Sequence, residues 1–174
     1  MKKWPNIFSL QQADELDVLS LWSGLGYYRR ARNLKACAEI VCTEYKGYFP
    51  KEEKLLQKLP GIGKYTAAAI RAIAFGIPSV VVDGNVERIA ARLFNLGNTL
   101  EKSKSKINNE MMMLSPNNRP GDFAQAMMDL GATICKPTNP KCPKCPIQNY
   151  CIANKKGSTS SIPKRNKKIS KVLR

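Results

Sequence analysis

Four cysteines close together in the sequence have the spacing of a metal site. Cys135, Cys142, Cys145 and Cys151 are separated by six, two and five residues. Thiolates that converge on one point bind a soft tetrahedral acceptor, either zinc or an iron–sulfur cluster, and the spacing alone does not distinguish the two. Disulfides or unrelated buried thiols are the alternative. We predict a metal site, because Pro5 and nearby polar residues interrupt the apolar stretch of a secretory signal and so indicate a reducing compartment.

A segment with two glycines ahead of a helical run has the composition of a phosphate-binding hairpin. Residues 59–66 have the sequence Leu-Pro-Gly-Ile-Gly-Lys-Tyr-Thr and precede an alanine-rich run. Gly61 and Gly63 let the backbone approach a ligand closely, the helix start offers unpaired N–H groups, and Lys64 adds a positive charge. A plain connection between two helices explains the same residues. The segment Val-Asp-Gly-Asn-Val at 82–86 makes the combination more specific.

Histidine is absent from the 174 residues. This excludes Ser-His-Asp and Cys-His catalysis, histidine metal ligands and imidazole acid–base chemistry. Carboxylates, lysine, tyrosine and cysteine remain as catalytic groups.

The chain is strongly basic, with 29 Lys and Arg against 13 Asp and Glu, a net charge of +16. Residues 155–174 hold eight basic residues and no acidic one, and a run of glycine and serine there is typical of a flexible linker. The remaining residues keep 21 basic against 13 acidic side chains, a charge of +8. A folded basic surface attracts polyanions through counterion release, so we expect a nucleic-acid partner.

Apolar residues recur at three- and four-residue steps in three segments, which predicts helices with one buried face each. The three stripes are Ala31, Leu34, Ala38, Val41 and Tyr45, then Val86, Ile89, Ala90 and Leu93, then Phe123, Ala126, Met127 and Leu130. Strand signals are confined to a few β-branched residues at 79–82, so we predict an all-α fold. No apolar run approaches the roughly 18 residues of a membrane span, so we expect no membrane partner.

Together these segments resemble the helix-hairpin-helix DNA glycosylases, and within them the A/G-specific adenine DNA glycosylases (the MutY family). The resemblance extends from about residue 4 to residue 153 and is strongest at 21–34, 59–66, 82–86, 123–131 and in the cysteine motif. It implies a barrel lobe of six helices carrying the hairpin over residues 1–77, a helical iron–sulfur lobe over 78–154, and a basic linker or tail over 155–174. By the same resemblance the four cysteines hold a 4Fe-4S cluster.

The resemblance also implies a reaction in base excision repair. The family hydrolyses the bond between deoxyribose and an adenine mispaired with 8-oxoguanine or guanine in double-stranded DNA, after flipping the adenine into a pocket. Asp83 matches the catalytic aspartate, whose carboxylate stabilises the positive charge that develops on the sugar. An Asp-Gly pair also suits a helix N-cap or a turn. The other matches are Asn85 and Tyr65 at positions that support the chemistry and contact the base, Tyr27 at the aromatic wedge, and Arg30, Gly61, Gly63, Lys64 and Thr66 at DNA-contacting positions.

Tyr65 separates two kinds of enzyme within this superfamily. Endonuclease III-type relatives carry a lysine here, whose amine attacks the sugar and allows strand cleavage through a Schiff base. A phenol cannot do this, and the neighbouring Lys64 points elsewhere on a helix. We therefore predict a monofunctional glycosylase. An endonuclease III-like glycosylase/lyase and a non-catalytic iron–sulfur DNA-binding fragment are the alternatives.

Two parts of the family pattern have no match here. The glutamate that protonates the departing adenine, within a Glu-x-Met-Leu-Gln-Gln-Thr-like segment, is absent, and so is the domain that recognises 8-oxoguanine. We expect a truncated or split enzyme with its N-terminal helices missing, with impaired catalysis, exposed apolar surface and marginal stability. A separate N-terminal fragment could complete it. We expect a cytoplasmic protein of bacterial type that associates with the nucleoid.

Overall fold

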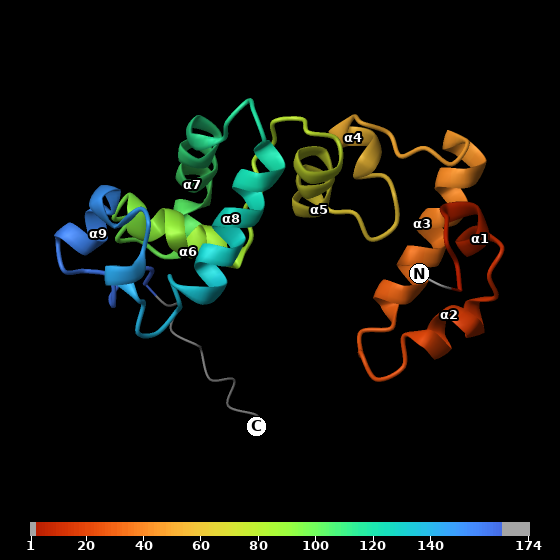
Figure 1. Ribbon diagram of the computed structural model, residues 1–174, viewed down its shortest axis with the longest axis horizontal. Coiled ribbons are helices and arrows are strands. Elements are labelled where there is room, and N and C mark those ends of the chain that lie inside the picture. Colours follow the sequence, from red (N-terminus) through yellow and green to blue (C-terminus); the bar gives the residue numbers. More distant parts are fainter. Residues whose placement is uncertain (1–2, 165–174) are drawn as a thin grey trace, which may run out of the picture. The chain divides into compact units, whose positions relative to one another are not determined.

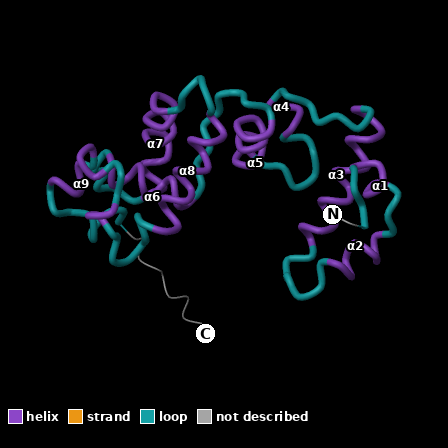
Figure 2. Tube along the Cα trace, viewed as in Figure 1, coloured by secondary structure: helices purple, strands orange, loops and turns teal. Residues whose placement is uncertain are grey.

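The computed structural model describes residues 3–164, in which helices are joined by loops (Figures 1 and 2). Within this range there is no β-strand, only an isolated bridge between Thr99 and Lys164, so the all-α prediction is confirmed. The chain divides into two compact units, Met1–Ala68 and Ala69–Arg174. This division lies earlier than the expected domain boundary between residues 77 and 78. None of the described helices is long and apolar enough to cross a membrane.

The first unit is organised around one long helix. Its helices are α1 (Ile7–Gln11), α2 (Glu15–Leu21), α3 (Arg29–Tyr45), α4 (Glu53–Leu56) and the start of α5 (Lys64–Ala69). The Asn6 side chain caps α1 and that of Asp14 caps α2, because each accepts a hydrogen bond from a backbone N–H of the first turn. Helix α3 packs against α1 and α2 and buries Ala31, Ala38 and Val41, as the stripe predicts.

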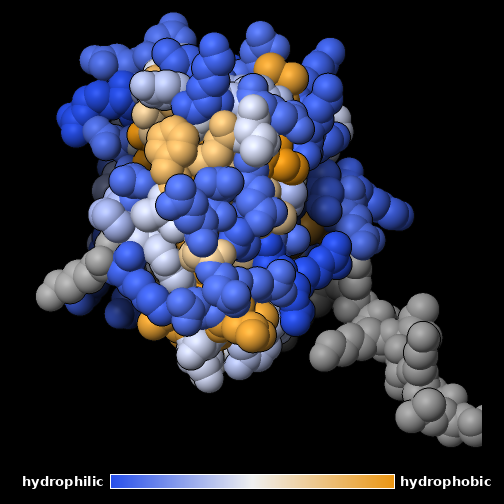
Figure 3. Space-filling model, turned by 90° about the vertical axis from the view of Figure 1, so that its right-hand side faces the viewer, coloured by the Kyte–Doolittle hydropathy of each residue, from blue (hydrophilic) through white to orange (hydrophobic). Residues whose placement is uncertain are grey.

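One member of that stripe is exposed. The side chain of Leu34 is 46% exposed, so the prediction was wrong at this position. Leu34 lines an apolar groove of about 440 Å³ together with Leu10, Leu21 and Trp22. Figure 3 shows apolar surface among hydrophilic side chains on the side of the molecule that carries this unit. The first unit therefore carries exposed apolar surface.

The second unit is built around α6. Its helices are a π-helical turn (η1, Ile70–Ala74), α6 (Gly84–Leu93), α7 (Leu100–Leu114), α8 (Pro120–Thr133), two 3-10 turns (Cys142–Lys144 and Gln148–Tyr150) and α9 (Ile152–Lys155). Helix α6 contacts α7, α8 and α9 (Figure 1). All four residues of its predicted stripe are buried. On α8 the stripe is only partly right, since Met127 and Leu130 are buried but Ala126 is exposed.

The segment after α9 returns to the core of the second unit. Ile162 is 5% exposed and its carbonyl oxygen accepts a 2.9 Å hydrogen bond from Arg92 Nε. Ser158 Oγ bonds Asn95 Oδ1 at 2.7 Å. Ser158 and Ile162 thus contact the rest of the second unit, whereas Ser160, Ser161 and Lys164 of the expected linker are exposed. The basic residues of 165–174 lie outside the described residues.

Candidate functional site

Asp83 lies at the N-terminus of α6 with its carboxylate held at both oxygens. Asp83 Oδ1 accepts a hydrogen bond from the Val86 N–H at 2.8 Å, and Oδ2 accepts one from Asn85 Nδ2 at 3.2 Å. Asp83 is therefore the N-cap of α6, one of its two expected roles. The residue is half-buried and its neighbour Gly84 is exposed, so the carboxylate is fixed close to the surface.

Arg88, one turn into α6, holds the other end of Asn85. Its Nη2 donates to Asn85 Oδ1 at 2.8 Å and to the Gly131 carbonyl oxygen at 2.7 Å. Its Nε donates to the Cys135 carbonyl oxygen at 2.8 Å. Burial is the main cause that lowers the pKa of this guanidinium, while Cys135 and Asp83 act to raise it. Because Arg88 fixes the amide orientation of Asn85, the Asn85 N–H₂ group faces Asp83.

This arrangement can stabilise a cation. A fixed carboxylate that is partly shielded from water interacts more strongly with a nearby positive charge than one that moves freely in solvent. Gly131 on α8 allows α6 to approach closely, because a Cβ there would lie 2.6 Å from Asn85 Cβ. The structure thus brings Asp83 and Asn85 together and supports them from α8.

The predicted hairpin lies in the first unit, between α4 and α5. Gly61 has a left-handed φ of 78°, and a Cβ there would lie 2.9 Å from Asn33 Cβ. Gly63 has open space around it, and Gly61, Gly63 and Lys64 are all exposed. The turn therefore presents accessible backbone and one positive charge. Tyr65 is 42% exposed at the start of α5, and Thr66 follows it half-buried.

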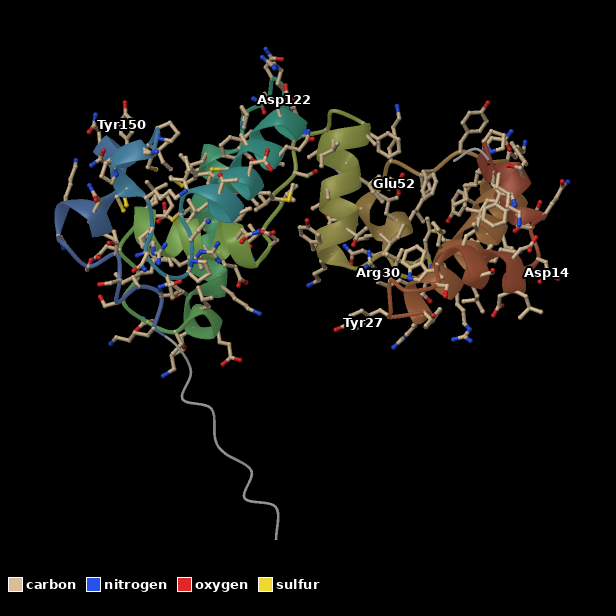
Figure 4. The ribbon with its side chains drawn as sticks, turned by 60° about the horizontal axis from the view of Figure 1, so that its bottom comes forward. Asp14, Tyr27, Arg30, Glu52, Asp122 and Tyr150 are labelled. Atoms are coloured by element: carbon tan, nitrogen blue, oxygen red, sulfur yellow. The ribbon has the colours of Figure 1, made fainter. Side chains whose placement is uncertain are left out.

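Tyr27 and Arg30 lie at the loop between α2 and α3. Tyr27 is 83% exposed, has a left-handed φ of 49° and points away from the first unit (Figure 4). The Arg30 N–H donates to the Tyr27 carbonyl oxygen at 2.8 Å. The loop therefore presents an aromatic side chain to the outside, next to the basic first turn of α3.

The four cysteines of the motif line one small cavity of about 30 Å³ in the second unit. Within the described part of the chain, no three histidine, cysteine, aspartate or glutamate side chains gather closely enough to hold a single metal ion. The four thiols of the described chain thus line one cavity without converging on a single point. Burial is the largest cause that raises the pKa of the Cys145 thiol. A hydrogen bond with the Ile147 backbone opposes this increase, and the charges of the other three cysteines add to it.

Arg92 supports the cysteine loop from α6. Its side chain is buried and its Nη1 donates to the Lys136 carbonyl oxygen at 2.7 Å and to Cys135 Sγ at 3.3 Å. The Cys151 thiol donates in turn to the Arg92 carbonyl oxygen at 3.5 Å. A buried guanidinium beside four thiol groups suits an anionic thiolate-bound centre, so the donor set fits an iron–sulfur cluster.

A family model described as "HhH-GPD superfamily base excision DNA repair protein" matches residues 1–117. The chain belongs to this superfamily. The adenine DNA glycosylase of Homo sapiens is 42% identical over 161 residues, which are 90% of this chain and 29% of that protein. The adenine DNA glycosylase of Buchnera aphidicola (subsp. Acyrthosiphon pisum, strain APS) is 41% identical over 172 residues, which are 98% of this chain and 49% of that protein. The chain thus spans less than half the length of each.

Solved structures of the HhH-GPD kind have the same fold. A thermostable thymine-DNA glycosylase matches with a TM-score of 0.78 and 31% identity, over 89% of this chain and 72% of that one. Endonuclease III in a non-covalent DNA complex matches with a TM-score of 0.72 and 26% identity, over 90% of this chain and 72% of that one. The predicted helix-hairpin-helix glycosylase fold is therefore confirmed.

Two functional candidates of this HhH-GPD chain were missed in the sequence. Arg88 and Arg92 were counted only as part of the positive charge, yet both are buried. A signal for them does exist, because Asn85, Arg88 and Arg92 are spaced three and four positions apart and so share one face of a helix. Polar residues in that pattern, next to the apolar stripe of α6, indicate a buried hydrogen-bond network.

Proposed function

We propose that this chain carries the glycosylase core of an adenine-removing base excision enzyme. Its substrate is an adenine mispaired with 8-oxoguanine or guanine in double-stranded DNA. The proposal is supported by the adenine DNA glycosylases that are about 40% identical over most of the chain. The observation that carries it in the structure is the Asp83 carboxylate, fixed at the start of α6 by Val86 and Asn85.

In this proposal Asp83 acts on the sugar by its charge. As adenine leaves, positive charge develops on the deoxyribose, and a fixed carboxylate next to it lowers the free energy of that state. Asn85 keeps the carboxylate oriented, and Arg88 keeps Asn85 oriented. Tyr65 contacts the flipped base.

In this proposal the hairpin and the basic loop of the cysteine motif bind DNA phosphates. The exposed backbone at Gly61 and Gly63, with Lys64 beside it, suits a DNA phosphate. Lys136, Lys141 and Lys144 are solvent-accessible and lie between the cysteines. The net charge of +16 favours the same partner.

Cys135, Cys142, Cys145 and Cys151 would hold a 4Fe-4S cluster. When bound, the cluster supplies iron–thiolate bonds that fix the loop between α8 and α9. Arg92 prepares the loop for this role, because its hydrogen bonds orient the Cys135 side chain and the next two carbonyl groups. The loop lysines are then held at the surface.

The group that would protonate the departing adenine has no match in the printed sequence. The printed sequence holds no Glu-x-Met-Leu-Gln-Gln-Thr-like segment. Lack of a general acid slows a reaction by about a hundred- to ten-thousandfold, so we expect slow adenine release by these 174 residues alone. A single-turnover assay on a duplex with adenine opposite 8-oxoguanine tests this. Release at an ordinary enzymatic rate would show that another group supplies the proton.

A peptide with the missing segment then separates an enzyme from a binding module. Faster adenine release after its addition supports a split glycosylase. If the chain binds the duplex, yet neither the chain alone nor the mixture releases adenine over hours, the non-catalytic DNA-binding fragment is favoured instead.

Endonuclease III is the second candidate, because its fold matches this chain. Tyr65 argues against a lyase reaction, since a phenol forms no Schiff base. Borohydride should therefore trap little or no covalent adduct between this chain and DNA that contains an abasic site. Tyr65→Lys serves as the positive control. Efficient trapping of the unchanged protein would favour the glycosylase/lyase.

A further inference from the structure

The loop that precedes α3 is held in an unusual conformation. Gly24, Gly26 and Tyr27 all have left-handed φ values, of 84°, 66° and 49°. Glycine adopts this region readily, but a bulky residue such as tyrosine does so at a cost in free energy. Tyr27 is also 83% exposed, so burial of its ring does not compensate for that cost. Contacts elsewhere in the loop must therefore fix its conformation.

Trp22 supplies two of these contacts from the end of α2. Its indole Nε1–H donates to the Gly26 carbonyl oxygen at 2.9 Å, and its own carbonyl oxygen accepts from the Leu25 N–H at 3.2 Å. The indole ring is half-buried and lines the apolar groove between the first three helices. Trp22 thus ties the turn directly to the packed part of the first unit.

Arg30 closes the loop from its other end. Its guanidinium carbon lies 5.5 Å from the centroid of the Trp22 ring, within range of a cation–π interaction. Its backbone N–H donates to the Tyr27 carbonyl oxygen at 2.8 Å. Trp22 before the loop and Arg30 after it therefore contact each other. Each of them also forms a hydrogen bond with the turn between them. Arg30 and Tyr27 are both labelled in Figure 4.

We infer that Trp22 and Arg30 are positioning residues that hold the 23–27 loop so that Tyr27 is presented to DNA. This inference rests on the proposed function, because it needs a duplex that Tyr27 contacts. Stacking of an exposed aromatic ring on bases depends on its direction, and that direction is set by the backbone of Gly26 and Tyr27. Neither Trp22 nor Arg30 needs to touch the reacting sugar for this role.

The test uses the full chain and a duplex with 2-aminopurine opposite 8-oxoguanine. Fluorescence of 2-aminopurine rises when the base leaves the stack, so it reports on local opening. Trp22→Phe keeps an aromatic face for Arg30 but removes the indole N–H. We expect this variant to lower the equilibrium constant for base opening, obtained from the fluorescence gain, about fivefold, the change that loss of one hydrogen bond produces. Arg30→Gln and Tyr27→Ala should reduce the gain as well.

Tyr48→Ala is the matched control, because Tyr48 is an 80% exposed aromatic residue of the same unit outside the loop. It should keep the full fluorescence gain. A role in general folding alone would lower the melting temperature without a selective effect on fluorescence, so melting curves are measured for each variant. Wild-type fluorescence gain in both Trp22→Phe and Arg30→Gln, with loss in Tyr27→Ala, would overturn the inference and leave the proposed function intact.

Hydrogen exchange in the free protein tests the clamp without DNA. Trp22→Phe should speed exchange of the Leu25 and Arg30 amides, whose acceptors are the Trp22 and Tyr27 carbonyl oxygens. Unchanged exchange in this variant would overturn the clamp itself. If the unchanged protein produces no fluorescence gain on any duplex, the proposed function fails, and faster exchange would then support only the loop contacts.

Discussion

Arg88 joins the helix of the candidate catalytic aspartate to the cysteine loop, because its Nε donates to the Cys135 carbonyl oxygen at 2.8 Å. The same guanidinium bonds Asn85 on its own helix and Gly131 on α8. One side chain therefore connects the candidate catalytic group, α8 and the first cysteine of the motif. A shift of the cysteine loop can therefore alter the orientation of the Asn85 side chain through Arg88.

Arg88→Met should lower the free energy of unfolding by about 2–4 kcal/mol, because one buried and two partly buried acceptors lose their donor. Urea unfolding measures the change. Arg119→Met is the matched control, since the Arg119 side chain is 77% exposed and its ion pair with Asp122 is worth at most about 1 kcal/mol. Equal losses in the two variants would contradict the bridging role of Arg88.

The helices with strong stripes were predictable and the bridging contacts were not. The stripe of α6 places all four members in the core, because that helix is covered by α7, α8 and α9. Leu34 deviates because it faces the apolar groove on the first unit. Periodicity indicates which face of a helix is apolar, but it does not say whether another element covers that face.

The site was predictable where one short segment contains it. Asp83 and Asn85 are two positions apart, and the cysteines form one compact motif, so spacing alone points to both. Arg88 and Arg92 act across 47 and 43 positions in their bonds with Cys135, and such pairings follow only from the tertiary fold. The indole bond of Trp22 to Gly26 spans only four positions, but it depends on the left-handed turn, which the residue pattern does not reveal.

Asp83→Asn should reduce adenine release by at least about a hundredfold, because it removes the charge that stabilises the sugar cation. Asparagine caps a helix about as well as aspartate, so the melting temperature should change little. Single-turnover assays and melting curves on the same preparations measure the two effects. Asp122→Asn in the first turn of α8 is the control, and it should keep the rate of adenine release. Normal adenine release by Asp83→Asn would exclude the proposed role.

If the proposed cluster is bound, Cys145→Ser should abolish the iron–sulfur absorbance and lower the iron content, because this variant removes one of the four proposed ligands. The purified wild-type protein should contain about four iron atoms per chain. Cys42→Ser is the control, because Cys42 lies on α3 of the first unit and is not part of the motif. Both variants are measured by metal analysis and visible spectroscopy. One zinc ion per chain in the wild-type protein would show that the motif holds zinc instead.

DNA binding should weaken steeply with salt, because lysines of the cysteine loop replace counterions on phosphates. Lys141→Gln and Lys144→Gln remove exposed charges on either side of Cys142. If each lysine contacts one phosphate, each substitution should reduce the slope of log K against log salt by about 0.9. Fluorescence anisotropy of a labelled duplex at several salt concentrations gives the slope. Lys102→Gln on α7 is the control and should leave it unchanged. Slopes that match the wild-type value in both loop variants would place the DNA contact elsewhere on the chain.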